Sequence, residues 1–131
     1  MAVQDVENSY YSQYANRTYL TISTNVAAAV ATATIPAVAG RTFYVLGILI
    51  NGLGATVGLG VAPTITGLLG GTITLAYAAA VGVLVQNTNL NVSFGDVGIP
   101  ASAVNQSVVL SCPSLGTGNT SNTVVIWGYY L

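Results

Sequence analysis

The amino-acid sequence predicts an all-β fold, an antiparallel β-sandwich that is jelly-roll-like, with about eight strands and an extended N-terminal arm. Short runs rich in Val, Ile, Thr and Tyr alternate with turn residues at a spacing of about 8 to 12 residues. No heptad pattern or long amphipathic helical pattern interrupts them. The length of 131 residues is that of one domain.

Residues 1–19 are predicted to form the arm, and residues 20–131 the β-sandwich domain. The first segment holds three of the five charged residues and four of the eight tyrosines, which are Tyr10, Tyr11, Tyr14 and Tyr19. We expect it to be ordered by docking on another protein surface; a short helix or a disordered tail are the alternatives. Arg17 lies between two of the tyrosines, where its guanidinium could stack on a ring.

The first half of the domain contains three predicted strands. Residues 18–24, TYLTIST, alternate polar and apolar side chains, and the alternation within residues 27–36 favours a strand that ends at Pro36. A turn at residues 37–41 contains Arg41, which is either solvated or paired with an acid. Residues 42–50, TFYVLGILI, are apolar on both faces, as expected of a central strand.

The second half begins with a predicted break. Asn51 and Gly52 form the dipeptide typical of a tight hairpin turn, so we expect the central strand to end there. Residues 62–71 are expected to form a loop with its own apolar side chains. The other predicted strands are residues 55–61, 72–78, 80–86, 90–94, 107–112 and 122–131.

The last predicted strand contains VVIWGYYL, which has no charged or amide side chain. Alternation places Val125, Trp127, Tyr129 and Leu131 on one face and Val124, Ile126, Gly128 and Tyr130 on the other. One apolar face can fill the core, whereas the other needs a second cover, most simply another subunit. Trp127, Tyr129 and Leu131 are therefore predicted interface residues, together with Arg17 and the four tyrosines of the arm.

The scarcity of charge limits the possible partners. Only 4 % of the residues are charged and the net charge is −1, so the surface should lie in a membrane or be covered by other chains. Two arginines and no lysine cannot neutralise a phosphate track, which excludes nucleic acid. Residues 42–95 carry no charge, but frequent glycines and the lack of a basic cluster argue against membrane helices.

The inventory of reactive side chains argues against an enzyme. The chain has no His and no Lys, and its carboxylates are Asp5, Glu7 and Asp96. We expect no cofactor and no metal; Asp96 as a lone calcium ligand is a weak alternative. The single cysteine, Cys112, is expected to be a buried structural thiol. No secretory signal is visible, which fits synthesis in a reducing cytoplasm.

Three stretches of the chain resemble a known family. These are ATATIPAVAGRTFYVLGILI at residues 31–50, residues 89–119, and VVIWGYYL at residues 124–131. They are similar to the small β-sandwich decoration, or cement, proteins of tailed bacteriophage heads, over residues 28–131. The resemblance implies a homo-oligomer, with a trimer preferred, that braces the major capsid protein and has no enzymatic activity. It carries over no individual functional residue.

The expected function is therefore that of a structural virion protein on the capsid surface, made in the host cytoplasm. It would stabilise the capsid lattice by burying apolar surface, with no nucleic acid or membrane as partner. The alternative is a receptor- or carbohydrate-binding module of a head fibre or tail, in which Trp127 would contact the ligand. A membrane-associated coat subunit is a third possibility.

Overall fold

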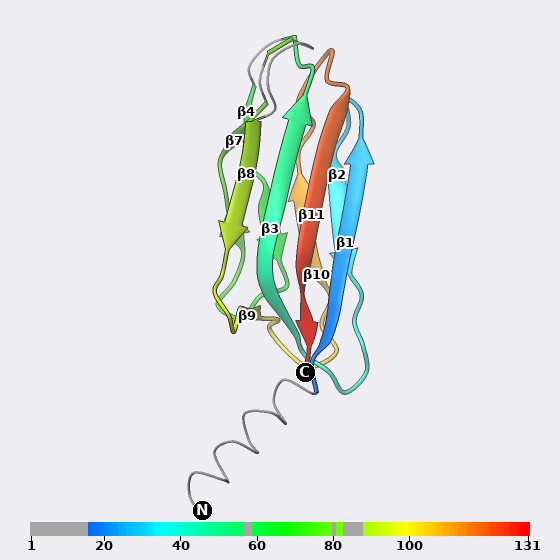
Figure 1. The fold of residues 1–131 in the computed structure, drawn as a ribbon, viewed down its shortest axis with the longest axis vertical. Helices are drawn as coiled ribbons and strands as arrows, with labels where there is room; N and C mark the ends of the chain where they lie inside the picture. Colours follow the sequence, from blue (N-terminus) through cyan, green and yellow to red (C-terminus); the bar gives the residue numbers. More distant parts are fainter. Residues whose placement is uncertain (1–15, 57–58, 80, 83–87) are drawn as a thin grey trace, which may run out of the picture.

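The computed structural model describes residues 16–56, 59–79, 81–82 and 88–131, and these form antiparallel sheets without a helix (Figure 1). The strands are β1 (Thr18–Val26), β2 (Ala31–Ile35), β3 (Phe43–Leu53), β4 (Gly60–Val61), β5 (Thr64–Thr66), β6 (Ile73–Thr74), β7 (Tyr77–Ala78), β8 (Thr88–Ser93), β9 (Ile99–Pro100), β10 (Val108–Cys112) and β11 (Ser121–Tyr130). The all-β prediction is confirmed. The described residues contain no helix that is long and apolar enough to cross a membrane.

The two larger sheets are stacked face to face. One has five strands, in the order β1-β11-β3-β8 with β9 paired to β3, and the other has four, in the order β2-β10-β5-β6. β4 and β7 form a small third sheet. In Figure 1, β2 and β10 lie behind β1, β11 and β3, so the molecule is an elongated two-layer structure.

The strand pairs are nested along the chain. The innermost pair is β5 with β6, and around it lie β4 with β7, β3 with β8 and β9, β2 with β10, and β1 with β11. Two further pairings, β11 with β3 and β10 with β5, join these pairs into the two large sheets. The outermost strands of the sequence therefore lie side by side, and β11 is central in its sheet.

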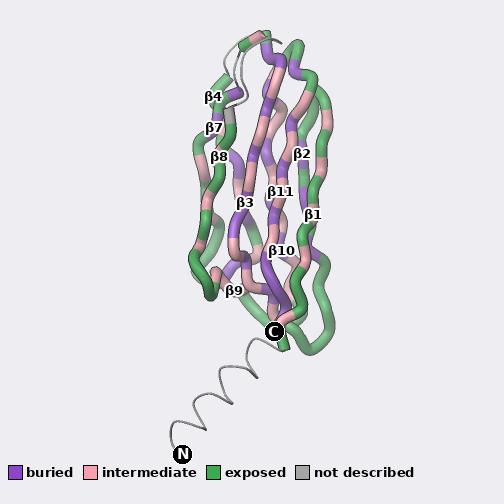
Figure 2. Tube along the Cα trace, in the orientation of Figure 1, coloured by how far each residue is buried: buried purple, intermediate pink, exposed green. Residues whose placement is uncertain are grey.

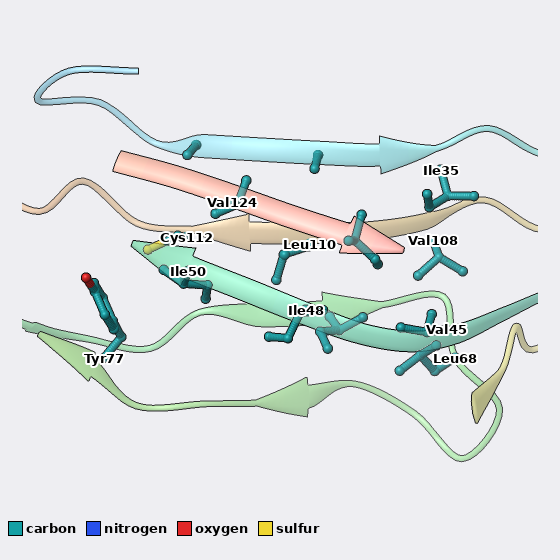
Figure 3. Close-up of a cluster of buried hydrophobic side chains, with 14 of the residues drawn as sticks. Ile35, Val45, Ile48, Ile50, Leu68, Tyr77, Val108, Leu110, Cys112 and Val124 are labelled. Carbon is teal, nitrogen blue, oxygen red and sulfur yellow. The ribbon is translucent and has the colours of Figure 1, made fainter. Parts of the chain in front are cut away.

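The core lies between the two sheets and follows from strict alternation. In β2 the buried residues are Ala31, Ala33 and Ile35, and in β10 they are Val108, Leu110 and Cys112. Figure 2 shows this alternation of buried and less buried positions along β3 and β11 as well. Figure 3 shows the resulting cluster, which extends from Tyr77 and Cys112 at one end to Val45 and Leu68 at the other.

A bulge redirects the side chains of β3. Trp127 pairs with Gly47 and Gly128 with Val45, so Leu46 has no partner in β11. Leu46 and Gly47 therefore both face away from the core, with Gly47 directly under the Trp127 indole. The bulge adds one apolar side chain to the outer face of the five-stranded sheet.

The predicted turn at Asn51 and Gly52 is wrong. Both residues lie inside β3, paired with β11 and β8, and the Asn51 side-chain amide donates a hydrogen bond to Asn89. Gly52 is needed for packing, since a Cβ there would lie 2.3 Å from a Leu115 methyl carbon. The chain leaves the strand only at Gly54, where φ is +86°.

Other strand predictions were correct in part. Residues 64–66 of the expected loop form β5, and residues 72–78 form two short strands with different partners. Residues 80 and 83–86 of the predicted strand 80–86 lie outside the described residues. The described ranges contain eleven strands, not about eight, and four of them have two residues each. β1 begins at Thr18, so the end of the predicted arm belongs to the sheet.

Candidate functional site

A cluster of aromatic rings covers the outer face of the five-stranded sheet around Tyr129. Tyr129 is only 1 % exposed, although its side chain points away from the core between the sheets. Its ring is stacked on that of Tyr44, with centroids 5.1 Å apart and an interplanar angle of 1°. The Tyr19 ring is tilted against it at a centroid distance of 5.8 Å. Neighbouring strands β1, β11 and β3 supply one ring each.

Two segments outside the sheet complete the cover of Tyr129. The Arg17 guanidinium carbon lies 4.1 Å from the centre of the Tyr129 ring, and the Arg17 Nη1 donates to the Asp96 carbonyl at 3.4 Å. The Tyr129 hydroxyl donates to the Val97 carbonyl at 2.7 Å. The chain thus buries Tyr129 by itself, and the expectation that a monomer leaves this ring uncovered is wrong. Arg17 stacks on the ring of Tyr129, whereas the sequence had suggested stacking beside the neighbouring tyrosines of the arm.

A cavity of about 330 Å³ opens beside this cluster, next to Trp127. Its lining residues come from the segment before β1 (Arg17), from β1 (Tyr19), from the bulge (Leu46), from β11 (Trp127), and from the end of β8 and the following turn (Ser93, Gly95 and Asp96). Trp127 is half-buried, and a Cβ on Gly47 would lie 2.3 Å from the indole Cζ2. A glycine at position 47 is therefore required for the indole to lie this close to the sheet.

The basal end of the molecule is a second candidate surface. We give this name to the end at which β1 begins and β11 ends, together with the β2–β3, β5–β6, β8–β9 and β9–β10 connections. Reciprocal backbone hydrogen bonds of 3.0 and 2.9 Å join Thr42 to Leu131, and the Asn105 amide donates to the Arg41 carbonyl at 2.9 Å. Arg41 Nη1 also donates to the Thr18 hydroxyl at 2.8 Å, which ties the β2–β3 turn to β1.

Exposed apolar side chains gather at the basal end. Of the nine large apolar side chains that are exposed among the described residues, six lie there: Tyr19, Val38, Leu69, Val97, Val104 and Leu131. All three charged side chains of the described residues, Arg17, Arg41 and Asp96, belong to the same end. The opposite end has the other three apolar side chains, Val30, Leu59 and Val81, and the described part of it has no charge.

The structure brings most of the predicted interface residues together. Arg17, Tyr19, Tyr129 and Trp127 surround one patch of the outer face, and Leu131 lies at the adjoining basal end with 42 % of its surface exposed. Tyr10, Tyr11 and Tyr14 lie outside the described residues. The role of these residues at an interface stays a prediction.

Several residues of these surfaces have no periodic signal in the sequence that marks them. Tyr44 was missed because its place beside Tyr129 depends on the register between β3 and β11. Leu69, Val97 and Val104 were missed because they lie in connections that have no periodic pattern. A search for isolated apolar residues between Gly, Ser and Asn could have found them.

The described residues offer little reactive chemistry. They contain no cluster of three or more His, Cys, Asp or Glu side chains that could hold a metal ion. Burial raises the pKa of the Cys112 thiol from 9.0 to about 11, against the smaller, opposite effect of a hydrogen bond with Asn122. The thiol is therefore protonated near neutral pH, which makes it a poor nucleophile.

Comparison with known proteins gives no relative from which a role could be transferred. No protein-family model matches the chain, and no curated protein sequence matches it.

Proposed function

We propose that this protein is a structural virion subunit: a capsid decoration protein that forms a homo-oligomer, preferably a trimer, and reinforces the lattice of the major capsid protein. The observation that carries this proposal is the gathering of six exposed large apolar side chains at the basal end. Exposed apolar side chains that are concentrated in one region of a surface favour a protein–protein contact there. The proposal includes no catalytic activity, and it places the protein on the capsid surface.

The order of the strands supports a jelly-roll topology, which we propose as the finer description of the fold. If the eight strands of the two large sheets other than β9 are numbered along the chain, the sheets have the orders 1-8-3-6 and 2-7-4-5. Two stacked sheets with this nested order are typical of jelly rolls, which occur in viral capsid and lectin domains. A jelly-roll fold does not by itself imply a function, so the functional proposal depends on the basal end.

The distribution of charge supports the same function. Three charged side chains among the described residues are few for a surface exposed to water, and covering an uncharged surface costs little desolvation. Each apolar side chain that a neighbouring subunit covers contributes about 25 cal/mol per Å² of area removed from water. A subunit that contacts several neighbours in this way stabilises the whole lattice.

The oligomer is tested by size-exclusion chromatography with light scattering. We expect the wild type to be a trimer and the double variant Leu69→Ser, Val104→Ser to shift toward the monomer. The matched control is Leu59→Ser, Val30→Ser, which removes one exposed leucine and one exposed valine from the opposite end. A wild type that is monomeric at every concentration, or equal effects of both double variants, would contradict the proposal.

Attachment to the capsid is tested by co-expression with the candidate major capsid protein of the same genome, followed by sedimentation of the assembled shells. The protein should sediment with the shells. A deletion of residues 1–15 should reduce this attachment and leave the domain folded, because β1 begins at Thr18 and Arg17 is kept to cover Tyr129. Absence of the full-length protein from the shells would contradict the capsid assignment.

A further inference from the structure

We propose that the cavity beside Trp127 is a carbohydrate subsite that binds one neutral sugar ring. This role goes beyond the structural function. The cavity opens on the outer face of the five-stranded sheet and shares Arg17, Tyr19 and Asp96 with the basal end, and Ser93 and Trp127 allow it to be tested separately. The inference stands on three properties of the cavity: its aromatic wall, its fixed polar groups and its balanced charge.

The aromatic wall is formed by Trp127 and Tyr19. Gly47 lies directly under the indole, which holds the ring close to the sheet, while Trp127 remains only half-buried. Tyr19, on the neighbouring part of β1, is 59 % exposed. The C–H groups on one face of a pyranose ring are apolar and carry a partial positive charge, so they pack well on the electron-rich face of an aromatic ring. Two partly exposed rings in one cavity suit such a ligand.

The polar groups lie in the same cavity, at the end of β8 and before β1. Asp96 supplies a carboxylate that accepts hydrogen bonds, and Arg17 supplies a guanidinium that donates them. The Ser93 hydroxyl, which accepts a hydrogen bond of 3.4 Å from the Gly95 amide, can donate its own proton to a ligand. Sugar hydroxyls both donate and accept, so this combination matches adjacent hydroxyl groups.

Arg17 is held in place before any ligand binds. Its guanidinium stacks on Tyr129 and donates to the Asp96 carbonyl, and the same turn is held by the hydrogen bond from the Tyr129 hydroxyl to Val97. A group that is already ordered loses little conformational entropy when the ligand arrives. The buried Tyr129 therefore acts as a positioning residue for the cavity.

Charge and volume narrow the class of ligand. Among the described residues, one cation and one anion line the cavity, so their charges balance, which favours a neutral sugar over a phosphate or a nucleotide. The volume of about 330 Å³ is close to the lower limit of ligand sites, roughly 300 Å³. One sugar ring fits this size, with the rest of a glycan extending over the exposed Tyr19.

The test uses the intrinsic fluorescence of Trp127, since it is the only tryptophan of the chain. The full-length protein is titrated with glucose, galactose, mannose and N-acetylglucosamine and then applied to a glycan array. We expect a saturable change in emission with at least one neutral sugar. Asp96→Asn and Ser93→Ala should each weaken that binding by about tenfold. Asp96→Asn replaces one charged acceptor oxygen with an amide donor, and Ser93→Ala removes the hydroxyl.

The variants are chosen to leave the fold intact. Asp96 is exposed, and Asp96→Asn keeps the backbone carbonyl that accepts from Arg17. The matched control is Ser23→Ala, an exposed serine of β1 that does not line the cavity, and it should bind as the wild type does. No response to any sugar, binding unchanged in both cavity variants, or binding of anionic glycans alone would overturn the proposal. Sugar binding and oligomeric state are measured in separate experiments on different variants, so failure of this proposal can be distinguished from failure of the proposed function.

Discussion

At the scale of single residues, Gly128 shows how closely β11 approaches β3. A Cβ at this position would lie 1.9 Å from the Tyr44 carbonyl oxygen and 2.8 Å from Cζ of Phe43. Gly128 has no positive φ, so packing and not backbone conformation requires the glycine. It separates Trp127 from Tyr129, and a shift of the strand here would displace both rings of the outer face.

Gly128→Ala is therefore expected to destabilise the protein by about 2 kcal/mol or more, because neither the backbone carbonyl nor the Phe43 ring can move far in the core. The measurement is the free energy of unfolding in guanidinium chloride. Gly60→Ala is the control, since a Cβ at position 60 meets no atom of the described residues within 4 Å, and it should change stability by less than about 0.5 kcal/mol. Similar losses in both variants would contradict the packing argument.

At the scale of elements, Tyr77 joins the small sheet of β4 and β7 to the five-stranded sheet. The Gly52 amide of β3 donates a hydrogen bond of 2.5 Å to the Tyr77 hydroxyl, and both groups are buried. Burial raises the pKa of this hydroxyl, and the hydrogen bond from Gly52 opposes that effect. β7 is therefore held against β3 by the Tyr77 side chain, in addition to its short backbone pairing with β4.

Tyr77→Phe removes the acceptor and leaves the Gly52 amide buried without this partner, which should lower the free energy of unfolding by about 1 to 3 kcal/mol. Urea denaturation followed by circular dichroism measures the change. Tyr19→Phe is the control, because Tyr19 is largely exposed, and it should have little effect. If Tyr77→Phe is as stable as the wild type, the hydrogen bond does not hold β7 in place.

The elements also show how far sequence reasoning reaches. β1, β2, β10 and β11 were predicted because their side chains alternate between two faces over five or more residues. β5, β6, β7 and β9 are only two or three residues long, too short for alternation to be recognised. Gly52 was misread because a glycine required for close packing has the same sequence signal as a glycine required for a turn.

The candidate site was predictable only in part, for a similar reason. Trp127 and Tyr129 were correctly assigned to one face of the last strand, because alternation fixes the face within a strand. The cover of Tyr129 by Arg17, Tyr44 and Val97 was not predictable, since it depends on pairing between strands and on the conformation of a turn.

At the scale of the whole molecule, the burial of weak acids should make the protein less stable at alkaline pH. The pKa values of Cys112, Tyr77 and Tyr130 are all raised, chiefly by burial. An acid with a raised pKa in the folded state keeps its proton there after the unfolded chain has lost it. The contribution of such an acid to the free energy of unfolding is therefore complete below the pKa of the unfolded chain. It is lost as the pH rises toward the pKa of the folded protein.

We expect the melting temperature to fall as pH rises from about 9 toward 11, the range over which the Cys112 thiol titrates in the unfolded but not in the folded protein. Differential scanning calorimetry at several pH values measures this slope. Cys112→Ala lowers stability at every pH because it leaves a cavity, but its slope should be shallower than that of the wild type. Parallel slopes would show that the thiol does not contribute to the alkaline loss.

The nested pairing of the strands also determines when the fold can form during synthesis. β1 is made before the other described strands. Within the described part of the chain its only hydrogen-bonded neighbour is β11, which also connects β1 to β3. On the ribosome, β1 therefore cannot pair until β11 has emerged, and β3 has no partner on one of its two edges until then. Folds dominated by such distant contacts form slowly and are prone to aggregate before they close. Efficient production of this protein should therefore depend on protection of the nascent chain until β11 is released.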